Sequence, residues 1–93
     1  MMEPAGPGET EQRLRAVVHG YVQGVGFRWS AGRELSRLGL RGDAENRADG
    51  TVVVTATGPV AGLDGLVAWL CGGSTPGEVT RVDLDRTPAR DGA

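Results

Sequence analysis

Alternating apolar and polar positions along the chain predict four β-strands. An alternation of period two is typical of a strand with one face buried and the other in water. The runs that show it are 13–19, 41–47, 51–57 and 78–86. Asp49–Gly50 lies between the second and third runs, and an Asp-Gly pair in that position is a hairpin signal. We therefore expect two single strands and one hairpin.

The apolar residues of each run predict which side faces the core. In the first strand they are Leu14, Ala16 and Val18, and in the last they are Val82 and Leu84.

The strand 41–47 is mostly polar, but its alternation still separates two faces. One face carries Ala44 and Asn46, and the other carries Arg41, Asp43 and Glu45. If helices cover the Ala44 face, both acidic side chains lie in solvent on the open side of the sheet.

Two further stretches have apolar residues at helical spacing. The first spans about 27–38, with Phe27, Ala31, Leu35 and Leu38 on one side, and Gly39 can end it in a left-handed conformation. The second begins near Gly58–Pro59, where proline suits a first helical position, and Gly72–Gly73 ends it. Its apolar stripe is expected at Val60, Leu63, Val67 and Leu70.

The resulting order is strand, helix, strand, strand, helix, strand. It predicts an α+β protein with a ferredoxin-like split βαβ fold, in which both helices cover one face of an antiparallel sheet. We expect one domain at 12–87, a disordered N-terminal tail at 1–11, rich in Pro and Gly, and a polar C-terminal tail at 88–93.

Composition narrows the function classes. The chain has 93 residues and a net charge of −2, so no bulk positive field favours nucleic acid or acidic membranes. It lacks a signal-peptide pattern and an apolar run long enough to span a bilayer, so we expect a cytoplasmic protein. One Cys and one His provide no cluster for a metal. We expect Cys71 to be a buried, inert thiol and His19 a partly exposed structural residue.

The loop between the first strand and the first helix has the composition of an anion site. Gly24 and Gly26 let the backbone curl so that successive N–H groups converge. The helix that follows adds the positive end of its dipole, and Arg28 can offer its guanidinium fork to two oxygens of one anion. On spacing alone this signal is weak, because tight strand-to-helix turns need glycine for steric reasons as well.

The run Val18–Arg28 resembles the signature loop of the acylphosphatases, without a gap. The similarity continues through Leu38–Gly42 to Asn46, Asp49–Gly50 and Gly58, and spans roughly residues 13–85.

The resemblance implies a metal-free, cofactor-free hydrolase that splits acyl phosphates into a carboxylate and inorganic phosphate. It implies that Arg28 and Asn46 are catalytic, with Arg28 holding the phosphate and Asn46 positioning the attacking water. It further implies that backbone amides bind the phosphate at Gln23, Gly24, Val25, Gly26, Phe27 and Arg28. We expect a monomer whose partner is a small-molecule substrate.

Two positions depart from the family pattern. Asp43 stands where members usually carry an aromatic residue, and Glu45 where a basic or neutral one is common. Two other functions remain open at this point: a binding module of the same architecture, and an acylphosphatase-like domain that binds carbamoyl phosphate or serves a larger maturation enzyme.

Overall fold

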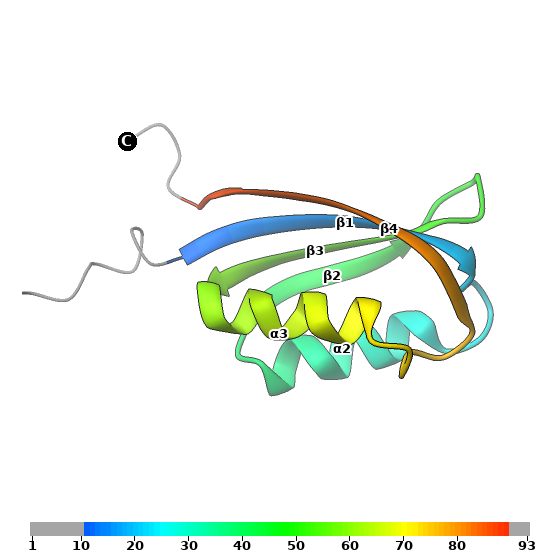
Figure 1. The fold of residues 1–93 in the computed structure, drawn as a ribbon, viewed down its shortest axis with the longest axis horizontal. Coiled ribbons are helices and arrows are strands. Elements are labelled where there is room, and N and C mark those ends of the chain that lie inside the picture. Colours follow the sequence, from blue (N-terminus) through cyan, green and yellow to red (C-terminus); the bar gives the residue numbers. More distant parts are fainter. Residues whose placement is uncertain (1–10, 90–93) are drawn as a thin grey trace, which may run out of the picture.

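Four strands and two helices follow one another in the predicted order in a computed structural model that describes residues 11–89. They are β1 (Glu11–Tyr21), α2 (Phe27–Arg37), β2 (Arg41–Asn46), β3 (Val52–Pro59), α3 (Val60–Cys71) and β4 (Glu78–Pro88). The strands form one layer and both helices lie side by side beneath it (Figure 1).

The sheet order is β2-β3-β1-β4, and every neighbouring pair is antiparallel. The two central strands pair with Val18 opposite Val52, and Val52 is also opposite Asn46 on β2. Because β3 runs antiparallel to both neighbours, β1 and β2 run in the same direction. Their C-terminal ends therefore lie at the same end of the sheet. The ferredoxin-like fold is confirmed.

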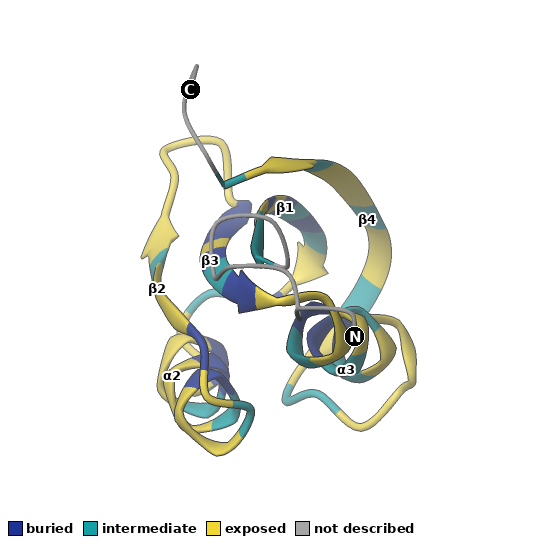
Figure 2. Cartoon of the chain, turned by 90° about the vertical axis from the view of Figure 1, so that its left-hand side faces the viewer, coloured by how far each residue is buried: buried dark blue, intermediate teal, exposed yellow. Residues whose placement is uncertain are grey.

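The core lies between the sheet and the helices, as Figure 2 shows by the dark blue on β1, β3 and the inner sides of α2 and α3. Leu14, Ala16 and Val18 are fully buried, which confirms the predicted face of β1. The rest of the core is Val22, Phe27, Ala31, Leu35, Leu40, Val52, Val54, Ala56, Leu63, Leu66 and Leu70.

The predicted apolar stripe of the second helix is partly wrong. Leu63 and Leu70 are buried as expected, but Leu66 is buried as well, whereas Val60 is 39% exposed. The N-cap of α3 is Pro59, so Val60 lies in the first turn at the end of the sheet. The buried positions 63, 66 and 70 keep helical spacing, and the predicted Val67 is partly buried against the same core.

Two residues expected to be buried are exposed. Leu84 lies on the same face as its partner Ala16, as predicted, yet it is 43% exposed because β4 is an edge strand. Cys71 ends α3 and is exposed, since Leu70 takes the inward position in the last turn. The expectation of a buried thiol is therefore wrong.

Both predicted tails fall largely outside the described residues. Glu11 already belongs to β1, where it pairs with Pro59, and Pro88 belongs to β4, where it pairs with Gln12. The regular structure therefore extends one residue beyond each predicted end of the domain.

Two glycines provide a matched test of this packing. A Cβ at Gly42 would overlap the carbonyl oxygen of Thr55 on the neighbouring strand, whereas one at Gly32 in α2 would meet nothing. We expect Gly42→Ala to destabilise the fold by about 1–3 kcal/mol through overpacking. Gly32→Ala should stabilise it by about 0.5–1 kcal/mol through helix propensity. Urea denaturation measures both, and equal shifts in the same direction would contradict this account.

Candidate active site

The loop between β1 and α2 adopts the curled conformation that its glycines allow. Gly24 and Gly26 have φ values of 75° and 86°, in the left-handed region that favours glycine. Gly26 is also the N-cap of α2, and no side chain accepts a hydrogen bond there. The first turn of α2 contains no acidic residue. The start of this helix therefore presents N–H donors and positive potential without a competing carboxylate.

A cavity of about 210 Å³ opens beside this loop. Its lining joins residues of the β1–α2 loop, α2 and β2: Val22, Gly24, Gly26, Phe27, Arg28, Trp29 and Asn46. The two residues predicted to be catalytic, Arg28 and Asn46, thus border one cavity although they lie on different elements.

Asn46 reaches the cavity because β2 ends there. It is the last residue of the strand and pairs with Val52, whose side chain is fully buried against the helices. Asn46 and Ala44 therefore lie on the helix-covered face, as the alternation predicted.

The two acidic residues of β2 lie on the opposite face and are exposed, as expected. Neither Asp43 nor Glu45 lines the cavity that holds Arg28 and Asn46. Asp43 does border a neighbouring groove between α2 and β2, and its Oδ1 accepts the N–H of Ala44 at 2.8 Å.

Two residues of the predicted phosphate loop do not line the cavity. Val25 packs against the core, where it is partly buried. The side chain of Gln23 points to the hairpin, where its Nε2 donates to the carbonyl of Arg47 at 2.8 Å and to that of Thr51 at 2.9 Å. This side chain therefore joins the loop to the turn that directly follows Asn46.

The sequence predicted a role for the backbone amide of Gln23 but none for its side chain. One sequence feature could have indicated a role for the side chain: Gln23 is the one residue with a long amide side chain in a loop of glycine and apolar residues. Its partners could not be known before the fold brought the 47–51 turn alongside.

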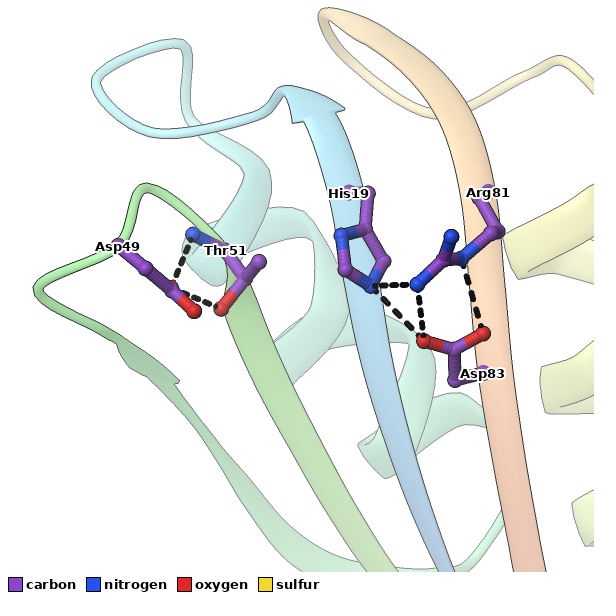
Figure 3. Close-up of polar contacts among 5 residues, drawn as sticks. All are labelled: His19, Asp49, Thr51, Arg81 and Asp83. Atoms are coloured by element: carbon purple, nitrogen blue, oxygen red, sulfur yellow. Dashed lines mark hydrogen bonds and ion pairs between the residues drawn. The ribbon is translucent and has the colours of Figure 1, made fainter.

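The hairpin turn is held by its own acidic residue (Figure 3). Asp49 Oδ1 accepts the hydroxyl of Thr51 at 2.6 Å and its N–H at 3.0 Å. These bonds, the hydroxyl first, lower the pKa of Asp49 below its usual value. The turn that Gln23 contacts is therefore internally ordered.

His19 takes no part in the cavity. It lies on the open face of the sheet, where its Nε2 is 2.9 Å from Oδ2 of Asp83 on β4 (Figure 3). The guanidinium of Arg81 also binds Asp83, and hydrogen bonds from Arg81 and then His19 lower the pKa of Asp83. His19 is thus a partly exposed structural residue, as expected.

Residues 11–89 contain no group of three or more His, Cys, Asp or Glu side chains that could hold a metal ion. No helix in this part of the chain has the length and apolarity needed to cross a membrane.

Comparison with known proteins identifies similar sequences and structures. The family model described as acylphosphatase matches residues 14–92. An acylphosphatase of Mycolicibacterium vanbaalenii is 50% identical over 78 residues, which cover 84% of each chain.

Two solved structures share the fold as well. The acylphosphatase of Bacillus subtilis has a TM-score of 0.79 and 34% identity, covering 87% of this chain and 90% of that one. An acylphosphatase from Coxiella burnetii has a TM-score of 0.82 and 28% identity, covering 92% and 90%.

The hydrogen bonds of Gln23 generate a prediction. Gln23→Glu places a carboxylate, which cannot donate, opposite two carbonyl oxygens, and we expect a loss of about 1–3 kcal/mol in unfolding free energy at pH 7. That environment raises the pKa of the introduced carboxyl, so the deficit relative to wild type should shrink as the pH falls through the raised pKa. Urea denaturation at several pH values measures this difference.

Gln23→Met is the matched variant, because it removes the same bonds without a titratable group. Its deficit should not depend on pH relative to wild type. A Gln23→Glu deficit that is equally independent of pH would contradict the contact.

Proposed function

Since the chain belongs to the acylphosphatase family, whose enzymes hydrolyse acyl phosphates, we propose that Arg28 binds the substrate's phosphate and Asn46 positions the attacking water. The protein is a hydrolase acting on acid anhydrides. The observation that carries the residue roles is the single cavity that both side chains line together with Gly24, Gly26 and Phe27.

The phosphate occupies the curl of the loop. Backbone amides from Gln23 to Arg28 converge on its oxygens, and the guanidinium of Arg28 adds a positive charge at the start of α2. Phosphoryl transfer proceeds through a loose transition state with charge spread over the peripheral oxygens. Fixed donors around those oxygens stabilise this charge without reorganising during the reaction.

Asn46 acts on the water. Its carboxamide both donates and accepts hydrogen bonds, so it can hold a water molecule in one orientation. A water held in line with the bond to be broken reacts as part of the bound complex rather than by collision. Asn46 is the last residue of β2, and it lines the same cavity as Gly24 and Gly26 of the loop.

Hydrolysis needs only the acyl phosphate, one water molecule and the residues named above. The water oxygen forms a bond to phosphorus, and the bond from phosphorus to the acyl oxygen breaks. The electron pair of that bond leaves with the carboxylate, and both protons of the water remain on the phosphate product. Because a carboxylate is a stable anion near neutral pH, no general acid has to protonate the leaving group. The proposal therefore includes no metal and no cofactor.

The proposed setting follows from the sequence. The single cysteine suits the reducing cytoplasm, and we propose a monomer that acts there on a small-molecule acyl phosphate. Inorganic phosphate, as the product, should compete with substrate for the same loop.

Replacing the guanidinium tests the charge role. Arg28→Ala should lower kcat/KM for acetyl phosphate, by an amount that corresponds to a loss of about 3–4 kcal/mol in transition-state stabilisation. The same variant should bind inorganic phosphate more weakly. Arg15→Ala is the matched control, because Arg15 is an exposed residue of β1. Near-normal hydrolysis by a folded Arg28→Ala variant would refute the assignment.

Replacing the carboxamide separates binding from catalysis. Asn46→Ala should reduce kcat by two or more orders of magnitude, about the effect of one lost transition-state contact, while inorganic phosphate still binds. Calorimetric titration with phosphate, alongside kinetics, measures both quantities. Loss of phosphate affinity in this variant would mean that Asn46 holds the anion instead of the water.

A further inference from the structure

Trp29 is a large aromatic side chain left in solvent beside the proposed phosphate site. It follows Arg28 in the first turn of α2 and is 67% exposed. It also lines the cavity that contains Arg28 and Asn46. An acyl group attached to a phosphate in that cavity can therefore contact this side chain.

Two grooves lie beside α2, and Trp29 borders both of them as well as the cavity. The inner groove, of about 420 Å³, lies between α2 and β2 and includes Gly42, Asp43 and Ala44. The outer groove, of about 500 Å³, lies between α2 and the end of α3 with the segment that follows it. Its lining is Trp29, Ser30, Arg33, Glu34, Ser36, Arg37, Trp69, Ser74 and Pro76.

The start of α2 and the end of α3 lie at the same end of the molecule (Figure 1). The ring contact between Phe27 and Trp69, with centroids 5.6 Å apart, joins the two helices there. The outer groove therefore adjoins the proposed phosphate site.

In-line geometry selects the outer groove. The attacking and leaving oxygens stand on opposite sides of phosphorus in phosphoryl transfer. Asn46, which is proposed to hold the water, belongs to β2, so the leaving acyl oxygen points away from β2. The inner groove is on the β2 side, and the outer groove is on the far side of α2.

Charge favours the same direction. The leaving group departs as a carboxylate, and the lining of the inner groove includes one basic and one acidic residue, Arg28 and Asp43. The outer groove contains Arg33 and Arg37, although Arg37 is paired with Glu34. The guanidinium of Arg33 stacks over the indole of Trp29, 4.9 Å from the ring centroid, and so orders that side chain.

We infer that the acyl group of the substrate lies in the outer groove against Trp29, and that this contact favours planar aromatic acyl groups over small aliphatic ones. The inference rests on the proposed function, since the phosphate position sets where the acyl group begins. An indole offers a broad apolar face, and aromatic pairs gain stabilisation beyond the area they bury.

Two substrates that differ only in the acyl group test the inference. We expect wild type to have a higher kcat/KM for benzoyl phosphate than for acetyl phosphate. Trp29→Ala should lower the value for benzoyl phosphate by about three- to ten-fold and change that for acetyl phosphate less than about two-fold. Trp29→Phe should keep most of the preference, because it keeps an aromatic face. Leu84→Ala is the control, an exposed apolar residue of β4 away from both grooves.

The outcomes separate the two proposals. If wild type hydrolyses both substrates but Trp29→Ala lowers both equally, or neither, the acyl subsite is wrong and the proposed function stands. If wild type hydrolyses neither substrate, the proposed function fails and the subsite fails with it. A selective loss for benzoyl phosphate that Trp29→Phe largely restores supports the inference.

Discussion

The antiparallel pairing of β3 with both β1 and β2 is the constraint on which the site depends. It makes β1 and β2 run in the same direction, so the loop after Tyr21 and the side chain of Asn46 lie at the same end of the sheet. The buried side chains of Val18 and Val52 hold this register, because a slip by one residue would turn every apolar side chain of a strand out of the core. The glycine loop and the carboxamide of Asn46 are therefore brought together by the packing of the core.

Gln23 adds a polar connection to this apolar constraint. Its two hydrogen bonds to carbonyls at 47 and 51 join the loop directly to the turn after Asn46. Asp49 and Thr51 order that turn from within. A proposed site built from a loop and a strand end thus acquires rigidity that glycine-rich backbone does not provide by itself. Helix α2 supplies the third side, with its dipole and Arg28 directed at the same cavity.

The open face of the sheet carries charged side chains that do not line the cavity. Glu45 stands on the open face together with the exposed cluster of His19, Arg81 and Asp83. The replacement of the usual family residues at 43 and 45 therefore leaves the cavity of Arg28 and Asn46 without a carboxylate in its lining. Beyond that cavity, the two grooves beside α2 differ in charge, which supports the proposed position of the acyl group.

Local patterns in the sequence determined the elements, the buried face of β1 and the face of Asn46, because alternation and helical spacing are properties of a single segment. The run Val18–Arg28 likewise indicated the family from the sequence alone. Tertiary structure alone decided which strands lie at the edges, and hence that Leu84 is exposed although its face was predicted correctly. It also decided that Leu66 of α3 is buried and Cys71 exposed, and it determined the hydrogen-bond partners of Gln23. The reason is physical: burial and hydrogen bonding depend on neighbours distant in the chain, which no local pattern contains.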